Sequence, residues 1–309
     1  MNTFKILSAD GGGIRGILLA RLIQRLGVLD ADLYAGTSTG GIIALGLAFG
    51  LKPEDLVDFY WKAGQTVFFR PTVFHRILGG VFNSQYDNTR LYDVLYSIFG
   101  EHKLGDLERK VLIPTFDLMA DDVGTWKPKF FHNLDSSDLD QRIVDVALRT
   151  TAAPSYFPSY QGYIDGGIIA NNPSMCALAQ SLDRGTVGAN LDDIRLLSIS
   201  TGRLSQGIDG ETLDWGLTKW IRYATNMAME GTVDVSHYQC SRVLKDHYFR
   251  IDPVLPKRIN LDDVSEVRDL IQIADEVELL NAEHWLDTNW NNNFGRFTRP
   301  DSGGTVPLV

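Results

Sequence analysis

A serine between two glycines is the first group in this sequence whose setting could support chemistry. Gly36-Thr37-Ser38-Thr39-Gly40 matches the pattern G-x-S-x-G and stands between a short apolar run and a helical run. That junction is typical of a nucleophile elbow, a sharp strand-to-helix turn whose flanking glycines leave room for an exposed serine. At a helix start, backbone N–H groups and the positive helix end favour negative charge. The pattern therefore predicts that Ser38 is a nucleophile.

A glycine loop near the N-terminus admits three interpretations. Residues 11–16 read GGGIRG, which satisfies G-x-G-x-x-G after a strand and before a helix and so suggests a dinucleotide site. In such a site an acidic residue ends the second strand, whereas here Asp32 begins that strand and Ala35-Gly36 end it. A P-loop is excluded because Ile17, not lysine, follows the last glycine. The third interpretation is a tight turn without a ligand.

The two glycine loops explain each other if they share one edge of a sheet. Loops that follow adjacent parallel strands emerge on the same side, so the segment from Gly11 to Arg15 can lie beside Ser38. Its backbone N–H groups would then face the carbonyl oxygen of an ester under attack. This arrangement is an oxyanion hole, in which each preorganised donor stabilises the transition state by about 3 kcal/mol.

A serine hydroxyl also needs a base, and histidine is the usual one. Hydrolases with this elbow continue with an acid and then a histidine, for which His237, His247 and His284 are candidates. His237 and His284 lie in helical patterns, and His247 opens the strand-like run HYFRI. None of the three has a local setting that marks it as catalytic.

An aspartate has a better setting for the base. Asp165 ends a short strand-like run and is followed by Gly166-Gly167, which presents a carboxylate at a strand end on a glycine turn. An ordinary Asp-Gly turn has the same appearance, so a histidine triad and a direct Ser–Asp pair both remain open at this point.

The elements that would position these residues alternate between short β-rich runs and longer helical runs. This pattern is typical of an α/β fold, with helices packed on both faces of a largely parallel sheet. The expected strands cover residues 4–9, 32–35, 111–116, 126–131, 163–165 and 194–199. The expected helices cover 14–26, 41–50, about 214–244 and about 261–286, and others begin near 53, 88 and 140. We expect one domain over residues 1–287 and a loop or disordered tail over 288–309, where turn formers are frequent.

Composition narrows the class of protein. The chain has 309 residues and a net charge of −10, which argues against nucleic acid as a partner. Cys176 and Cys240 form no metal-binding or disulfide pattern. No apolar run reaches the roughly 18 residues of a membrane-spanning helix, and no leader pattern opens the chain. We therefore expect a cytoplasmic enzyme without a metal or cofactor. The sequence indicates no oligomeric state.

Four motifs together resemble those of the patatin-like phospholipases. They are DGGGIRG at 10–16, GTSTG at 36–40, TTAAPSYFP at 150–158 and DGGIIANNP at 165–173, and they stand in that family's order. The resemblance covers residues 3–202 clearly and residues 239–256 weakly, and it implies a three-layer α/β/α fold. It also implies a Ser–Asp dyad in which Ser38 is the nucleophile and Asp165 its base. The residues that it implies for the oxyanion loop are Gly11, Gly12, Gly13 and Arg15.

The function that follows is that of a lipid acyl hydrolase, with phospholipase A or general acyl-ester activity. Ser38 would attack the ester carbonyl, Asp165 would take its proton, and water would then cleave the acyl-enzyme. One alternative is a Ser-His-Asp esterase that acts on small soluble esters. Another is a nucleotide-binding module that grips phosphate with the glycine loop. A regulated effector, switched on by a small molecule or by assembly, is compatible with the same residues.

One segment suggests how an acidic protein reaches a lipid. Residues 64–86 read GQTVFFRPTVFHRILGGVFNSQY, without an acidic residue. Basic residues are interspersed among aromatic ones in this segment, which includes Phe68, Phe69, Arg70, Phe74 and Arg76. We expect either ordinary core or an interfacial loop beside Ser38 that makes transient contact with a membrane surface. In the second case the phenylalanines would enter the lipid and the arginines would meet phosphates.

Overall fold

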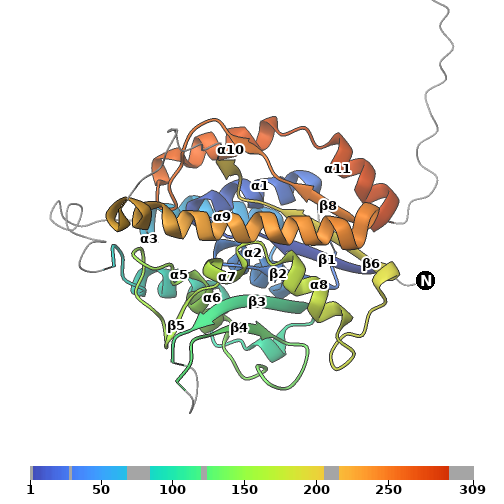
Figure 1. Ribbon diagram of the computed structural model, residues 1–309, viewed down its shortest axis with the longest axis horizontal. Coiled ribbons are helices and arrows are strands. Elements are labelled where there is room, and N and C mark those ends of the chain that lie inside the picture. Colours follow the sequence, from blue (N-terminus) through green and yellow to red (C-terminus); the bar gives the residue numbers. More distant parts are fainter. Residues whose placement is uncertain (1–2, 28–29, 68–83, 120–123, 205–215, 292–309) are drawn as a thin grey trace, which may run out of the picture.

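The chain folds around one large sheet with helices on both of its faces (Figure 1). The computed structural model describes residues 3–27, 30–67, 84–119, 124–204 and 216–291. The strands are β1 (Phe4–Ala9), β2 (Leu33–Gly36), β3 (Lys110–Asp117), β4 (Lys127–His132), β5 (Tyr163–Asp165), β6 (Ile194–Ile199), β7 (Arg203–Leu204), β8 (Tyr248–Ile251) and β9 (Val254–Leu255). The helices are α1 (Gly16–Leu26), α2 (Thr39–Phe49), α3 (Pro53–Val67), α5 (Thr89–Phe99), α6 (Ile143–Thr151), α7 (Gly167–Ala170), α8 (Ser174–Leu182), α9 (Leu217–Leu244), α10 (Val267–Glu276) and α11 (Leu280–Trp285).

The sheet is mostly parallel. Its order is β4-β3-β2-β1-β6-β8, with β5 paired to β3, and only β4 and β5 pair antiparallel among the described strands of this sheet. Ala9 pairs with Gly36 on one side and with Ile199 on the other. The carboxyl ends of β1, β2 and β6 therefore reach the same edge, and the loops that follow them lie together there.

Two apolar clusters fill the space between the three layers. The central strands are buried on both faces, because neighbouring residues such as Ile6 and Leu7 point to opposite sides and are both almost fully buried. Leu7 belongs to the larger cluster, which joins one face of the sheet to α1, α2, α3, α5, α6, α10 and α11. Ile6 belongs to the smaller one, which joins the other face to α8 and α9. The three-layer α/β/α expectation is confirmed.

Several expected elements have different bounds in the structure. The helix expected over 261–286 is interrupted: α10 begins at Val267 and ends at Glu276, and Val277 is extended. One reason lies outside the segment, since the Leu261 carbonyl accepts a hydrogen bond from the Ile14 N–H at 2.8 Å. Helix α8 had no counterpart among the expected helices.

A short helical turn follows α11. A turn of π-helix runs over Leu286–Trp290, and Trp290 is 1% exposed. Helical structure therefore continues past residue 287 to Trp290. Residues 292–309 lie outside the described part of the chain, as do residues 68–83, which hold Phe68, Phe69, Arg70, Phe74 and Arg76.

Candidate active site

Ser38 stands on a sharp turn between β2 and α2. Its φ of 54° and ψ of −123° lie in a region that non-glycine residues rarely adopt, which matches the strained geometry expected of a nucleophile elbow. Gly36 and Gly40, which flank this turn, are required because neighbouring backbone atoms leave no room for a side chain at either position. A Cβ on Gly36 would overlap the Gly40 carbonyl, and a Cβ on Gly40 would overlap the Ala9 carbonyl.

Hydrogen bonds from distant segments hold this turn in place. The Ser38 N–H donates to Thr150 Oγ1 at 2.9 Å, and the Thr150 hydroxyl donates in turn to the Pro114 carbonyl at 2.7 Å. The Thr37 hydroxyl donates to the Ala170 carbonyl at 2.6 Å. Thr150 lies in the TTAAPSYFP motif, and its position in the structure gives that motif a role in supporting the elbow.

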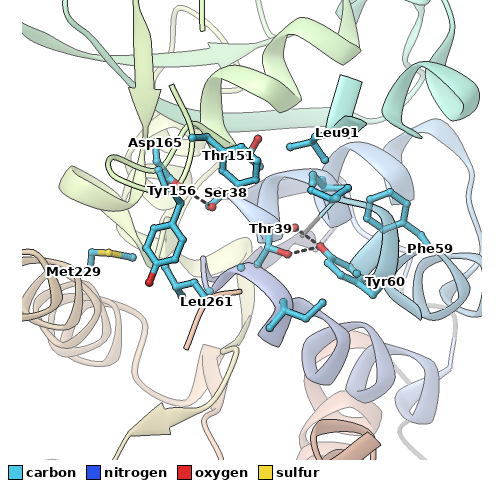
Figure 2. Close-up of a pocket in the computed structure, with 18 residues that line it drawn as sticks. Ser38, Thr39, Phe59, Tyr60, Leu91, Thr151, Tyr156, Asp165, Met229 and Leu261 are labelled. Carbon is cyan, nitrogen blue, oxygen red and sulfur yellow. Dashed lines mark hydrogen bonds between the residues drawn. The ribbon is translucent and has the colours of Figure 1, made fainter. Parts of the chain in front are cut away.

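Asp165 faces Ser38 directly (Figure 2). The Ser38 hydroxyl donates to Asp165 Oδ2 at 2.6 Å, and the Gly167 N–H donates to Asp165 Oδ1 at 2.7 Å. The carboxylate is 3% exposed, and burial raises its pKa to about 6 although both hydrogen bonds act in the opposite direction. A Cβ on Gly166 would overlap the Pro114 carbonyl, so this glycine allows the chain to turn closely behind the carboxylate.

The three candidate histidines have other partners or lie elsewhere. His237 Nδ1 lies 3.2 Å from the Tyr248 hydroxyl, and His247 Nδ1 lies 2.9 Å from the Arg195 guanidinium. His284 lies on α11. Of the residues that the structure describes, no histidine lines the pocket that contains Ser38 and Asp165. The described geometry therefore favours the direct Ser–Asp pair over the triad.

The glycine loop lies beside the elbow, but its members differ in position. Gly12 and Gly13 line the pocket with Ser38. The Gly11 N–H donates to the Asn171 carbonyl at 3.0 Å, and is therefore engaged. The Arg15 guanidinium is turned away from the pocket, where it donates to the Gly12 and Gly202 carbonyls at 3.4 and 3.3 Å. Of the four residues expected in the oxyanion loop, Gly12 and Gly13 are thus the two that line the pocket with Ser38.

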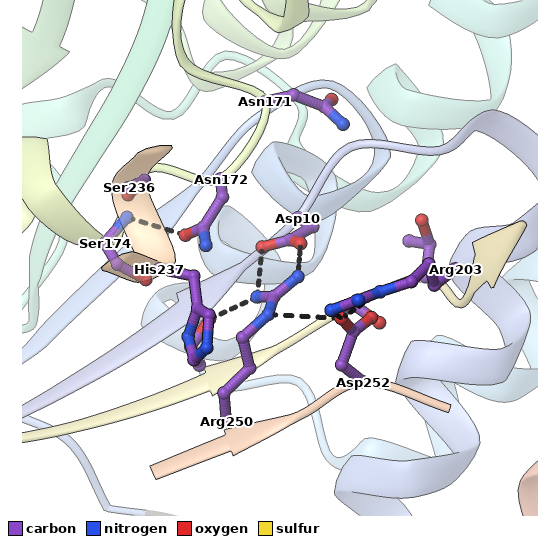
Figure 3. A network of polar contacts seen from close by, with 12 residues as sticks. Asp10, Asn171, Asn172, Ser174, Arg203, Ser236, His237, Arg250 and Asp252 are labelled. Carbon is purple, nitrogen blue, oxygen red and sulfur yellow. Dashed lines mark hydrogen bonds and ion pairs between the residues drawn. The ribbon is translucent and has the colours of Figure 1, made fainter. Parts of the chain in front are cut away.

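A buried ion-pair network lies behind the glycine loop (Figure 3). The Arg250 guanidinium donates to Asp10 Oδ2 at 2.6 Å and Oδ1 at 3.3 Å, and to the Ser198 hydroxyl at 2.7 Å. Burial opposes the charge on Arg250, but the attraction of Asp10 and Asp252 outweighs it and raises the pKa of the guanidinium. Strand β8 thus fixes the first residue of the loop. Sequence reasoning missed Arg250, whose only signal is a charged residue inside the apolar run HYFRI.

The dinucleotide interpretation has no support from the position of its acidic residue. The Asp32 carboxylate accepts a hydrogen bond from the Lys5 N–H at 2.8 Å, near the start of β1. It therefore lies at the amino edge of the sheet, opposite to the edge that carries the glycine loop.

The pocket around Ser38 is mainly apolar. It contains about 680 Å³ of space free of protein atoms, part of which is open to solvent. Its apolar walls come from several helices and loops, namely from Ile42, Phe59, Val67, Leu91, Phe157, Met229 and Leu261. The Tyr60 hydroxyl donates to the Thr39 carbonyl at 2.9 Å and so ties α3 to the start of α2. A pocket of this kind suits a hydrocarbon chain whose carbonyl reaches Ser38.

In this site a serine on a strand-to-helix turn donates a hydrogen bond to a buried carboxylate at the carboxyl edge of an α/β sheet. This arrangement is typical of one class of enzymes, the serine-dependent hydrolases with a nucleophile elbow. Comparison with known proteins identifies the family. The family model described as patatin-like phospholipase matches residues 7–178. The chain therefore belongs to the patatin-like phospholipase family and is a serine-dependent ester hydrolase that acts on lipids.

Curated relatives come from bacteria and plants. Protein teg of Priestia megaterium is 30% identical, and the match covers 94% of this chain and 100% of that protein. The cGAMP-activated phospholipase of Pseudomonas aeruginosa is 31% identical over 81% of this chain and 78% of its own length. Patatin-like protein 1 of Arabidopsis thaliana is 29% identical, and the match covers 80% of this chain and 73% of that protein. Within the described residues, no helix has the length and apolar character needed to cross a bilayer.

Proposed function

We propose that this enzyme hydrolyses acyl esters of phospholipids through an acyl-enzyme on Ser38, with Asp165 as the sole base. The observation that carries the proposal is the 2.6 Å hydrogen bond from Ser38 Oγ to Asp165 Oδ2 at one wall of an apolar pocket. Phospholipid is the proposed substrate because the apolar walls fit an acyl chain and because the relative in Pseudomonas aeruginosa is named a phospholipase.

In the first half-reaction, Ser38 Oγ attacks the ester carbonyl and its proton passes to Asp165 Oδ2. The carbonyl oxygen gains negative charge, and the N–H groups of Gly12 and Gly13 stabilise that charge. Asp165 then gives the proton to the leaving alcohol, and the acyl group stays on Ser38. In the second half-reaction, water attacks the acyl carbonyl, Asp165 takes the proton, and Ser38 leaves as the hydroxyl when the proton returns to it.

Replacement of the nucleophile tests the proposal. We expect Ser38→Ala to abolish release of fatty acid from phospholipid vesicles, measured by mass spectrometry, while circular dichroism and the melting temperature stay near those of the wild type. A fluorophosphonate probe should label Ser38 in the wild type and nothing in the variant. Retained turnover in a pure, folded Ser38→Ala sample would contradict the assignment.

Single substitutions of the three histidines serve as the matched control for the base. His237→Ala, His247→Ala and His284→Ala should each keep most of the activity, whereas Asp165→Asn should lose a factor of about 100 to 10,000, because an amide cannot accept the serine proton. If one folded histidine variant were as inactive as Ser38→Ala, the triad would replace the dyad. Analysis of the lipid products would also identify the head group and the acyl position that the enzyme prefers.

A further inference from the structure

The side chain of Asn171 is buried without a hydrogen-bond partner at its oxygen. Asn171 is 5% exposed, and its Oδ1 accepts no hydrogen bond from any residue in the described part of the chain. A buried polar atom in this state costs about 1 to 3 kcal/mol, so its presence calls for a partner or a role. The residue stands in the DGGIIANNP motif, but the dyad does not use it.

The unpartnered oxygen lies close to both members of the dyad. A Cβ built on Gly11 would overlap Asn171 Oδ1 and would lie 3.3 Å from Ser38 Cβ. A Cβ built on Gly167 would lie 3.1 Å from Asn171 Oδ1 and also 3.1 Å from Asp165 Oδ1. The two glycine positions thus lie between the amide oxygen and the dyad, Gly11 on the side of Ser38 and Gly167 on the side of Asp165.

The backbone of Asn171 is held from two directions. Its carbonyl accepts the Gly11 N–H at 3.0 Å, and its own N–H donates to the Thr232 hydroxyl of α9 at 3.4 Å. Figure 3 shows the amide of Asn171 apart from the ion pair of Asp10 and Arg250. These two backbone contacts preorganise the side chain of Asn171.

A second cavity reaches Asn171 and shares no described lining residue with the acyl pocket. It contains about 280 Å³ of space free of protein atoms, and its lining is polar, including Arg15, Asn171, Thr201 and Glu230. Asn171 is not part of the apolar pocket lining, which contains Ser38 and Asp165. This polar cavity can hold water that does not contact an acyl chain in the apolar pocket.

We propose that Asn171 Oδ1 positions the water that hydrolyses the acyl-enzyme, an inference that rests on the proposed function. The water donates one hydrogen to Asn171 Oδ1 and the other to Asp165. Its oxygen bonds to the acyl carbon as Asp165 takes the proton. The bond from the acyl carbon to Ser38 Oγ then breaks, Asp165 returns the proton to Oγ, and the free carboxylic acid leaves. Asn171 is thus a positioning residue for deacylation, and acylation does not require it.

The test separates the two half-reactions. Asn171→Ala and Asn171→Ser are mixed with p-nitrophenyl octanoate in a stopped-flow instrument. We expect a burst of about one p-nitrophenol per active site at the wild-type acylation rate, followed by steady turnover about 100-fold slower than that of the wild type. Intact-mass spectrometry should find the octanoyl group on Ser38. Hydroxylamine, a strong nucleophile that needs little activation, should restore turnover in both variants.

Asn172→Ala is the matched control, since Asn172 is the adjacent asparagine, is 1% exposed and accepts a hydrogen bond from the Ser174 N–H. It should lower the melting temperature without a burst or an accumulated acyl-enzyme. If acylation and deacylation fell together in the folded Asn171 variants, or if neither changed, the proposal would be overturned. Failure of the dyad itself has a different signature, because Ser38→Ala would then turn over and no variant would carry an acyl group on Ser38.

Discussion

At the residue scale, the central feature of the site is a carboxylate kept in a setting that opposes its charge. Asp165 is 3% exposed, and its polar partners in the described structure are the Ser38 hydroxyl and the Gly167 N–H. Burial raises its pKa from 3.8 to about 6. A base of this strength is still ionised at neutral pH but accepts a proton more readily than an exposed aspartate.

The raised pKa predicts the pH dependence of the rate. Asp165 acts as a base only when it is ionised, so kcat/KM for a short soluble ester should fall about tenfold per pH unit below pH 6 and level off above pH 7. The measurement is a series of initial rates from pH 4.5 to 8.5, with fluorophosphonate labelling of Ser38 followed in parallel. A rate that stayed constant down to pH 4.5 would rule out a base with this pKa.

The same shift predicts a stability that changes with pH. Because the folded pKa lies above the unfolded value, the protonated form favours folding, and this contribution is complete below pH 3.8 and lost as the pH rises through about 6. At neutral pH the ionised carboxylate lowers the free energy of unfolding by about 3 kcal/mol. Asp165→Asn should therefore unfold at higher urea concentration than the wild type at pH 8, and the difference should shrink towards pH 4. If Asp165→Asn were more stable than the wild type by the same amount at every pH, the titration of Asp165 would not be the cause.

At the element scale, strand β8 anchors a loop that is 240 residues away in sequence. Arg250 lies opposite Ser198 in the sheet register, and its guanidinium forms a bidentate pair with Asp10 at the end of β1. Both side chains are at most 4% exposed, so removal of one partner leaves a buried charge without its counterpart.

The buried ion pair predicts that removal of one partner destabilises the fold more than removal of both. Arg250→Met should lower the free energy of unfolding by about 3 to 5 kcal/mol, because Asp10 is left buried and unpaired. The double variant Asp10→Asn/Arg250→Met should recover most of that loss, since neither charge remains. Urea unfolding at pH 7 measures both. Equal losses in the single and double variants would show that packing of the arginine, not its charge, supports the loop.

An element could be predicted from the sequence where the contacts that shape it are made by neighbouring residues, and could not where they are made by distant ones. The elbow was predictable because Gly36 and Gly40 are needed by the backbone contacts of the turn itself. The break before α10 was not, since it accompanies a hydrogen bond between Leu261 and Ile14. The end of α10 also accompanies a contact with a distant residue, because the Arg25 guanidinium donates a hydrogen bond to the Val277 carbonyl at 2.8 Å. Asn171 was quoted within a motif, but only the folded chain reveals its unpartnered oxygen.

At the scale of the whole molecule, the long helix α9 links the site to the second face of the sheet. It crosses the molecule in front of the strands (Figure 1) and packs on α7 and α8. Met229 of this helix lines the apolar pocket, and Thr232 holds the backbone of Asn171. One element thus contacts both the acyl pocket and the residue proposed to position water, so the two half-reactions share one support.

The net charge of −10 does not favour attraction to anionic lipids. We expect the segment after α3, residues 68–83, to bind the lipid surface instead. Val67, the last residue of α3 and the last described residue before this segment, lines the apolar pocket. We expect Phe69→Ser/Phe74→Ser to lower binding to phosphatidylcholine vesicles and phospholipid turnover severalfold, because these rings would enter the lipid. Hydrolysis of a short soluble ester and the melting temperature should stay nearly unchanged.

Trp126→Ser provides a matched control, since this aromatic residue is 73% exposed and does not line the pocket. Its loss should leave vesicle binding unaltered, which shows that the effect depends on position and not on the number of surface aromatics. A large fall in the melting temperature of Phe69→Ser/Phe74→Ser would instead show that the two rings are core residues. Because binding through apolar side chains is insensitive to salt, vesicle binding of the wild type should persist at 0.5 M NaCl, whereas binding through Arg70 and Arg76 alone would be lost.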